Sequence, residues 1–412
     1  MLPLQARRVV LGVTGGIAAY KAAEVASTLV KLGAEVDVIM TSSAQEFVTP
    51  LTFQSLTHRP VVTDMFRLLA DSHIGHVTLG ERAEAVLIAP ATANTIAKLA
   101  AGLADDMLSC TVLATRAPVI VAAAMNDLMW ENPVTQENIG RLRARGFVVV
   151  EPEYGRLAEG KLGKGRLVEP RLIVDEVRAA LGRYGDLTGK RVVVTAGGTQ
   201  EPIDPVRYIT NLSSGRMGYA IAEAARDRGA AVTLISGLSA LPRPGGVDFV
   251  SVRTAAEMQQ RVIPACESGD ILVMAAAVAD YRAASVSEQK MKKFGEDGLT
   301  LQLVKNPDIL RLAAERFGRR GLPVLVGFAA ESENLLAHAR RKLADKGVDV
   351  IVGNDITAPN SGFGTETNQV VLVHQGGEEV LPLLPKYEVA WRVLDLALEL
   401  LRRKEASPRP AL

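Results

Sequence analysis

A hydrophobic strand followed by a glycine turn and a helix occurs twice in the chain. The first copy covers residues 8–16 and leads into an amphipathic segment, 17–32. The second covers 190–198 and leads into a helix expected to begin near Ser213. Consecutive β-branched residues predict buried parallel strands, and paired glycines let the backbone approach a ligand closely. Because a helix N-terminus beside such a turn attracts anions, the sequence predicts two phosphate-binding α/β units in tandem.

Length, charge and cysteine content narrow the class of protein. The 412 residues exceed what one core usually covers, so two domains are expected. A net charge of +1 provides no general attraction for nucleic acid or an anionic membrane, and no uncharged stretch is long enough to span a bilayer. With only Cys110 and Cys266, a disulfide framework or a thiolate zinc site has no support, and a cytoplasmic location without a signal peptide is expected.

Small and polar residues follow three predicted strands of the first half, in Thr41–Ala44, Ala85–Asn94 and Pro118–Asn126. Open α/β sheets bind ligands at the carboxyl ends of their strands. For Thr41–Ala44 alone, helix capping is the favoured interpretation. Together the three strand ends suit a flat cofactor with a phosphate, and the absence of a Gly-x-Gly-x-x-Gly fingerprint favours a mononucleotide over a nicotinamide dinucleotide.

The segment Gly155–Arg166 is rich in glycine and basic residues. It is not a phosphate loop, because Leu162 stands where a magnesium-binding hydroxyl is required and Gly163 and Gly165 interrupt the helix that should follow. The sequence favours a mobile flap that closes on an anionic substrate, and an ordinary surface loop is an equally open alternative.

In the second half, Asp270–Tyr281 is predicted to be a strand that presents Asp280 at its ligand-facing end, to a ribose or a magnesium ion. Ser213 or Ser214 is expected to cap the helix that follows the second glycine turn. The basic run Lys290–Lys293 would usually be a solvated face, but beside an anion-binding turn it suits a triphosphate.

These motifs resemble, in order and spacing from Arg8 to about Leu401, the bifunctional phosphopantothenoylcysteine decarboxylase/phosphopantothenate–cysteine ligase family of coenzyme A biosynthesis. The resemblance implies two tandem Rossmann-like doubly wound domains: an FMN-binding decarboxylase domain, 1–182, and a CTP-dependent ligase domain, 190–404, separated by a turn-rich segment. It also implies a homo-oligomer, with a trimeric flavoprotein half and a dimeric ligase half that together form a dodecamer.

For the first domain, the resemblance implies catalytic roles for His76, Asn126 and Glu159, and spacing selects His76 over His73. Ala123 departs from the family pattern, which usually has proline there. The implied FMN contacts are Gly15, Gly16, Ser42, Thr92 and Asn94. The implied substrate contacts are Met129, Gly163, Gly165 and Arg166.

Glu159 stands where the bacterial family commonly has a cysteine. The resemblance implies that flavin oxidises the cysteine part of the substrate, carbon dioxide leaves, and the ene-thiol is reduced with protonation by that cysteine. An unperturbed Glu has a pKa of about 4.3 and is a poor acid at neutral pH. Closure of the flap over Glu159 would raise its pKa; alternatively, water or another side chain supplies the proton.

For the second domain, the resemblance implies that CTP activates the carboxylate of 4'-phosphopantothenate and that the cysteine amine then displaces CMP. Lys290 matches the catalytic lysine, Asn211 the residue that handles the acyl-cytidylate, and Asp280 a Mg²⁺ ligand. The implied CTP contacts are Met274, Ala275, Ala276, Asp280, Lys290, Asn306, Pro307, Asp308, Ile309, Phe328, Lys342 and Lys346.

Two other classes of protein remain as alternatives. The first is a non-catalytic FMN-binding regulatory flavoprotein of the same fold. The loss of His76, Asn126 or Lys290 would have favoured this class, and all three residues are present. A nicotinamide-dependent dehydrogenase is less favoured, because both the glycine fingerprint and an acid suited to the ribose are missing after the first glycine turn.

Overall fold

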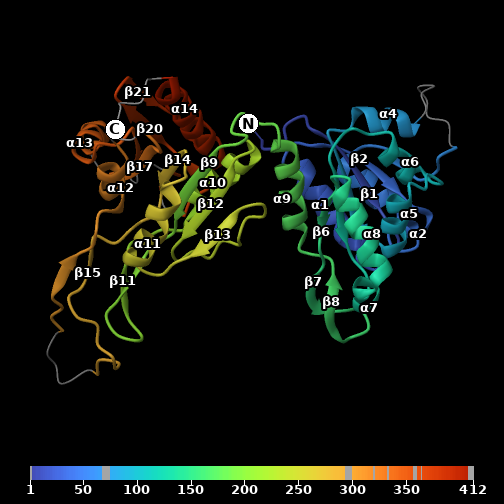
Figure 1. The fold of residues 1–412 in the computed structure, drawn as a ribbon, viewed down its shortest axis with the longest axis horizontal. Coiled ribbons are helices and arrows are strands. Elements are labelled where there is room, and N and C mark those ends of the chain that lie inside the picture. The colour runs from blue at the N-terminus through green and yellow to red at the C-terminus, as the bar shows by residue number, and fades with distance from the viewer. Residues whose placement is uncertain are drawn as a thin grey trace. The chain divides into compact units, whose positions relative to one another are not determined.

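The computed structural model describes residues 2–66, 75–292, 299–318, 321–331, 334–355, 360–362 and 364–406. The chain divides into two compact units, Met1–Arg183 and Tyr184–Leu412 (Figure 1). Each unit has its own sheet and its own hydrophobic core.

The sheet of the first unit is parallel, with strand order β3-β2-β1-β4-β5-β6. Its strands are β1 Arg8–Val13, β2 Glu35–Met40, β3 Val61–Val62, β4 Ala85–Ala91, β5 Val119–Ala123 and β6 Val148–Val150. The chain moves outward from β1 to β3 and then returns to the other side of β1 with β4. This reversal creates a crevice at the carboxyl ends of β1 and β4, the usual ligand position in such sheets.

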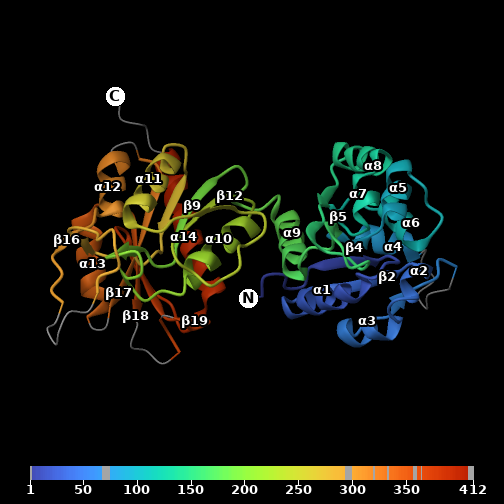
Figure 2. The ribbon, with the colours of Figure 1, turned by 90° about the horizontal axis from the view of Figure 1, so that it is seen from below.

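Helices cover both faces of this sheet (Figure 2). They are α1 Ala19–Lys31, α2 Ser42–Gln45, α3 Pro50–Thr57, α4 Gly75–Arg82, α5 Ala93–Ala101, α6 Met107–Leu113, α7 Asp127–Glu131, α8 Pro133–Ala144 and α9 Pro170–Gly182. Leu29, Phe53 and Ile173, from α1, α3 and α9, pack in the core of one face. Ile96 and Ile139, from α5 and α8, pack in the core of the other. The first unit is therefore doubly wound.

The second unit has an eight-stranded sheet of order β13-β12-β9-β14-β17-β18-β20-β21, parallel as far as β18 and antiparallel in its last two pairings. Its strands are β9 Arg191–Ala196, β12 Ala231–Ser236, β13 Asp248–Ser251, β14 Ile271–Met274, β17 Val324–Glu331, β18 Val350–Asp355, β20 Val370–His374 and β21 Gly377–Val380. Its helices are α10 Arg216–Asp227, α11 Ala255–Cys266, α12 Ile309–Phe317, α13 Leu335–Lys346 and α14 Lys386–Ala406.

Helices α10 and α14 pack on one face of this second sheet, and α11, α12 and α13 pack on the other. Short two-stranded ribbons border the sheet: β10 Gln200–Pro202 with β11 Tyr208–Thr210, β15 Tyr281–Ala283 with β16 Leu303–Lys305, and β19 Thr367–Asn368 with β22 Leu384–Pro385. Figure 1 shows β11 and β15 extending away from the sheet. The predicted fold class, two tandem doubly wound α/β domains, is confirmed.

Three predicted elements differ from the structure. The segment Gly155–Arg166, expected to be a mobile flap or an ordinary surface loop, belongs to an antiparallel hairpin in which β7 Glu153–Arg156 pairs with β8 Leu162–Arg166. The strand predicted over Asp270–Tyr281 ends at Met274, and the following residues form a loop. The helix expected near Ser213 begins at Arg216.

The late start of that helix has a local cause. Gly215 is its N-cap, with a left-handed backbone at φ 80° and no side chain of its own to cap the helix. A Cβ at Gly215 would lie 2.9 Å from the Ser239 hydroxyl, so glycine suits both the conformation and the space. Ser213 and Ser214 therefore precede the N-cap residue, but their hydroxyls still accept from the N–H groups of Gly215 and Arg216 at 3.3 and 3.4 Å, as the predicted capping requires.

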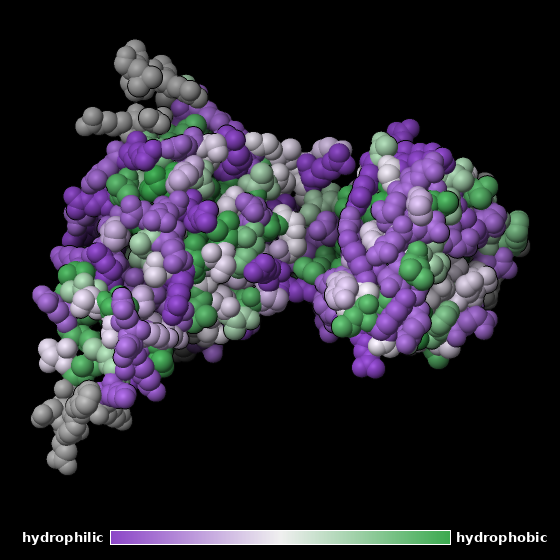
Figure 3. Space-filling model, turned by 60° about the horizontal axis from the view of Figure 1, so that its bottom comes forward, coloured by the Kyte–Doolittle hydropathy of each residue, from purple (hydrophilic) through white to green (hydrophobic). Residues whose placement is uncertain are grey.

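On the face shown in Figure 3, hydrophobic residues are interspersed among hydrophilic ones on each unit. Among the described residues, no helix has the length and apolar character needed to cross a bilayer.

Candidate functional sites

The glycine turn after β1 lies against the ends of two neighbouring strands. A Cβ on Gly15 would lie 2.3 Å from the Cβ of Ser43, and one on Gly16 would lie 3.8 Å from the Thr92 methyl group. Ser42 is the first residue of α2, directly beside Ser43. The residues predicted to contact FMN after β1, β2 and β4 are thus brought to one crevice, with Asn94 in the first turn of α5.

Thr14 joins two of these strand ends, and the sequence analysis did not single it out. Its side chain is 1% exposed. Its hydroxyl donates to the Pro90 carbonyl at 2.7 Å and accepts from the Thr92 N–H at 3.2 Å. A threonine directly before a glycine pair at a strand end is the signal that would have pointed to it.

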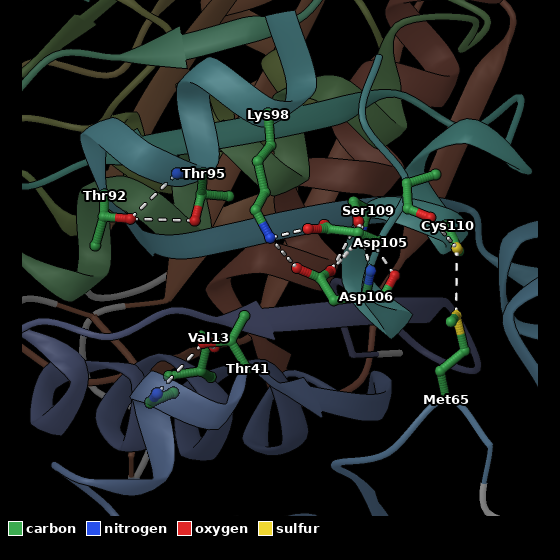
Figure 4. A network of polar contacts seen from close by, with 12 residues as sticks. Val13, Thr41, Met65, Thr92, Thr95, Lys98, Asp105, Asp106, Ser109 and Cys110 are labelled. Atoms are coloured by element: carbon green, nitrogen blue, oxygen red, sulfur yellow. Dashed lines mark hydrogen bonds and ion pairs between the residues drawn. The ribbon is translucent and has the colours of Figure 1, made fainter. Parts of the chain in front are cut away.

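Side-chain caps fix the helices that begin at this crevice (Figure 4). The Thr41 hydroxyl accepts from the Ala44 N–H, as predicted, and the Thr92 hydroxyl accepts from the Thr95 N–H, each at 3.3 Å. Because these hydroxyls are engaged in caps, the backbone is held in place for ligand contact.

The corner between α5 and α6 is fixed by an ion-pair cluster, also visible in Figure 4. Lys98 Nζ lies 2.7 Å from Asp105 Oδ1 and 3.0 Å from Asp106 Oδ2, and both carboxylates raise the pKa of Lys98. Asp106 also forms a capping box with Ser109. Nearby, burial and these carboxylates raise the pKa of the Cys110 thiol, so it is a poor nucleophile at neutral pH.

The β7–β8 hairpin docks on the loop between β5 and α7. The Met125 N–H donates to the Gly165 carbonyl at 3.0 Å, and Lys161 Nζ lies 2.7 Å from Asp127 Oδ1. A Cβ on Gly165 would lie 2.1 Å from the Met125 carbonyl oxygen, so only glycine allows this approach. A Cβ on Gly163 would meet the Asp127 carboxylate at 2.7 Å. Gly163 and Gly165, which were predicted to contact the substrate, therefore also allow the hairpin to pack closely on this loop.

Asn126 and Glu159 meet at this docking surface. Asn126 caps α7 through its Oδ1 and donates from Nδ2 to Glu159 Oε1 at 3.0 Å. The pKa of Glu159 is lowered, first by its own backbone N–H and then by the Asn126 amide, and its side chain is exposed. Glu159 is thus ionised at neutral pH, which is the opposite of the raised pKa that proton donation would require.

Three other residues predicted for this site take no part in the contact between Asn126 and Glu159. Met129 is 48% exposed in α7, and Arg166 is paired with Glu169 at the end of the hairpin. His76 lies half-buried in the first turn of α4, and the described contacts do not link it to Asn126 or Glu159. His73 lies outside the described residues.

A cavity of about 960 Å³ opens at the carboxyl ends of the second sheet. Its walls come from the N-terminus of α10, the loop after β14, the start of α12, the end of β17 and one face of α13. Asn211 and all of the residues predicted to contact CTP line this cavity, with the exception of Lys290. Lys290 lies on the exposed segment after β15, and Lys293 is outside the described residues.

Hydrogen bonds hold the loop after β14 in a fixed shape. Asn211 Nδ2 donates to the Val278 carbonyl at 3.0 Å, and Asn306 Nδ2 donates to the Ala279 carbonyl at 2.8 Å. The buried Thr199 hydroxyl accepts from the Ala279 N–H at 2.9 Å. The backbone of this loop is therefore preorganised to contact a ligand, whereas the Asp280 side chain is exposed.

The polar groups of the cavity suit an anionic ligand. Lys342 and Lys346 project from α13 on one side, with Lys346 Nζ 3.3 Å from Asp308 Oδ2, and Arg216 lies at the helix N-terminus on another. Asn354 Oδ1 is buried in the lining and has no hydrogen-bond partner among the described residues, so a bound donor would satisfy it. No group of three or more metal-ligating side chains occurs among the described residues, so magnesium at Asp280 would need phosphate ligands.

Two doubly wound domains, one with a glycine turn and capped helices gathered at the carboxyl ends of its strands and one with a preorganised polar cavity, define a two-domain α/β protein with a candidate ligand site on each sheet. Residues 2–182 match the family described as Flavoprotein, and residues 187–401 match the DNA/pantothenate metabolism flavoprotein C-terminal domain. The chain belongs to the family of the coenzyme A biosynthesis bifunctional protein CoaBC, as the following relatives show.

The CoaBC protein of Vibrio cholerae serotype O1 is 44% identical over 97% of this chain and 100% of its own length. That of Bacillus subtilis strain 168 is 46% identical over 95% of this chain and 97% of its own length. The solved C-terminal domain of a CoaBC protein is 39% identical and covers 53% of this chain and 98% of that chain, with a TM-score of 0.45. A phosphopantothenoylcysteine (PPC) decarboxylase mutant complexed with pantothenoylaminoethenethiol is 33% identical and covers 42% of this chain and 97% of that chain, with a TM-score of 0.38.

Proposed function

We propose that this chain catalyses two successive steps of coenzyme A biosynthesis. It is a bifunctional enzyme with ligase and decarboxylase activities, like the relatives that match it along almost its whole length. We assign the ligase step, which joins 4'-phosphopantothenate to cysteine, to residues 190–404, and the decarboxylation of the product to residues 1–182. The observation that carries this assignment is the gathering of the expected nucleotide contacts in one cavity. A purely regulatory flavoprotein is not favoured.

In the ligase cavity, a carboxylate must first be made electrophilic, and CTP would do so by forming an acyl-cytidylate and releasing pyrophosphate. Lys342 and Lys346 lie where they would offset phosphate charge. The backbone of 275–280, fixed by Asn211 and Asn306, would orient the nucleotide. Asp280 would help to hold magnesium, whose charge would offset that of the phosphates.

In the first unit, Gly15, Gly16, Ser42, Thr92 and Asn94 would hold FMN, whose chemistry when bound is the oxidation and re-reduction of the substrate's cysteine moiety. The close approach of Gly15 to Ser43 brings the turn backbone after β1 next to the start of α2, where both could contact one phosphate. The docked hairpin would exclude water from the substrate, and Asn126 would orient it. Because Glu159 is ionised, we assign it the orientation of Asn126, with proton delivery from water or from another side chain.

Mass spectrometry of the products tests this proposal. The FMN-loaded protein is mixed with 4'-phosphopantothenate, cysteine, CTP and Mg²⁺, and a parallel reaction omits CTP. The proposal predicts 4'-phosphopantetheine in the first reaction and no coupled product in the second. Ligation that proceeds equally well with ATP would overturn the assignment of CTP, and the absence of any product would favour a regulatory flavoprotein.

Self-association and location remain part of the proposal. Ile17, Tyr20 and Leu51 are each more than 60% exposed on the first unit, which supports burial of this surface against further copies of the chain. A trimeric flavoprotein half, a dimeric ligase half and a cytoplasmic location are expected. Sedimentation analysis of the full chain at several concentrations tests the oligomeric state.

A further inference from the structure

Lys386 is a buried lysine at the wall of the ligase cavity, and the proposed mechanism does not use it. It is the first residue of α14 and is 7% exposed. Its ammonium group donates to the carbonyls of Gly362, Thr365 and Thr367 and to the Thr365 hydroxyl. An ammonium group has three N–H donors, so four acceptors engage it completely. Lys386 therefore has no donor left for a substrate and must act through the segment it binds.

That segment comprises residues 360–362 and 364–368, hereafter the wall loop. Its end forms β19, which lies against α14 (Figure 2). The Lys386 backbone N–H also donates to the Glu366 carbonyl at 3.0 Å. Asn368, 1% exposed, closes the loop on itself by accepting from the Gly362 N–H at 2.9 Å. Lys386 thus fastens the wall loop to the start of α14, beside the pairing of β19 with β22.

The wall loop in turn contacts the first turn of α10. Glu366 is ion-paired with Arg216, and the Asn368 amide lies 3.9 Å from the Met217 sulfur. Arg216 and Met217 both line the cavity, at the helix N-terminus where an anion would be bound. A continuous set of contacts therefore connects the Lys386 ammonium with the guanidinium of Arg216, a residue of the cavity lining.

We propose that Lys386 is a positioning residue of the ligase site: it clamps the wall loop, and through Glu366 and Asn368 it holds Arg216 and the N-terminus of α10 in place for a substrate phosphate. This inference rests on the proposed ligase function. It assigns a role to a residue that touches no substrate, and its loss should weaken the binding of a phosphorylated substrate more than the chemical step.

The surroundings of Lys386 lower its pKa and so set an upper pH limit for its hydrogen bonds to the wall loop. Burial lowers the pKa of Lys386 to about 8, with Glu366 opposing the shift and Arg216 adding to it. The N-terminal dipole of α14 also disfavours positive charge at this position. The ammonium form, with its full set of donors, is thus present below this pKa and is lost as the pH rises through it. Substrate phosphates are already fully ionised there, because their second pKa is about 6.

Steady-state kinetics of the ligase reaction of the full FMN-loaded chain, with Lys386→Met, test the proposal. Methionine keeps most of the volume and removes every donor. At pH 7 we expect KM for CTP or for 4'-phosphopantothenate to rise about three- to tenfold, with kcat and KM for cysteine changing less than about twofold. The control is Lys404→Met, which removes a lysine from the same helix that pairs with Asp349 away from the cavity. Unchanged KM values in Lys386→Met, a fall in kcat alone, or an equal effect of Lys404→Met would overturn the proposal.

A pH series with the wild-type protein keeps the proposal testable even if Lys386→Met unfolds. The affected KM should rise between pH 7 and pH 9 in wild type, and this rise should be absent from a folded Lys386→Met variant. A KM that stays flat to pH 9 in wild type contradicts the clamp. Failure of the proposed function is a separate result, because it would appear as a wild-type protein that forms no phosphopantothenoylcysteine at any pH.

Discussion

At position 159 a carboxylate stands where the resembled family commonly carries a cysteine, and the structure gives this carboxylate a partner. The residue's own backbone N–H and then the Asn126 amide lower the pKa of Glu159, so it is ionised at neutral pH. The sequence could predict that a free glutamate is a poor acid. It could not predict the contact with Asn126, because that contact depends on the docking of the hairpin.

Two substitutions of Glu159 separate orientation from proton donation. In Glu159→Gln the side-chain oxygen still accepts from Asn126, so the decarboxylation rate should stay within about threefold of wild type, whereas Glu159→Ala should lose about three- to tenfold. The measurement is the rate of carbon dioxide release with phosphopantothenoylcysteine as substrate, together with the ratio of reduced to oxidised thiol product. A loss of reduced product in Glu159→Gln equal to that in Glu159→Ala would instead identify Glu159 as the acid.

The adjacent glycines Gly15 and Gly16 should respond differently to alanine. A Cβ at Gly15 would overlap Ser43, which overpacking data suggest costs about 1–3 kcal/mol of stability, whereas one at Gly16 makes an ordinary contact with Thr92. We expect Gly15→Ala to unfold at a lower denaturant concentration and to be purified without flavin absorbance. Gly16→Ala, the matched control, should unfold like wild type. Equal midpoints for both variants would show that the turn relaxes freely.

Among the elements, the β7–β8 hairpin is the one whose nature the sequence left open. Glycines and basic residues predicted a flap, since both disfavour a packed core, but the structure shows a paired hairpin fastened by Gly165 and Lys161. The strand predicted to continue to Tyr281 ends at Met274 because contacts from other elements shape the chain beyond it. The apolar residues after Met274 form a loop that Asn211 and Asn306 hold by hydrogen bonds.

Hairpin docking is tested by Gly165→Ala. The new Cβ would lie 2.1 Å from the Met125 carbonyl oxygen, so the hairpin must shift away from Asn126. We expect decarboxylation to fall at least about tenfold, since misplacement of a positioning residue by an ångström can cost more than this, with ligation unaffected. Gly140→Ala in α8 is the control, because a Cβ there meets nothing within 4 Å. It should leave both activities intact. Full decarboxylation by Gly165→Ala would show that the docked position is dispensable.

For the whole molecule, fold class and family followed from the sequence, because strand, glycine-turn and helix patterns are local. The residues that the sequence analysis did not foresee act over long separations. Thr14 bonds to Pro90 and Thr92, Lys386 fastens the wall loop, and Arg216 is paired with Glu366. None of these pairs has a local signature. Conversely, Lys290 was singled out by its basic run, yet it is not among the described residues that line the cavity.

The central claim is that two sites in one chain carry out two successive steps, and one pair of variants tests it most directly. Product time courses are followed by mass spectrometry for Asn126→Ala and Asn211→Ala, starting from 4'-phosphopantothenate, cysteine and CTP. Asn126→Ala should accumulate phosphopantothenoylcysteine at about the wild-type rate. Asn211→Ala should form little of it but should decarboxylate phosphopantothenoylcysteine that is added directly. If either variant loses both steps while remaining folded, the two activities do not reside in separate sites, and the account is contradicted.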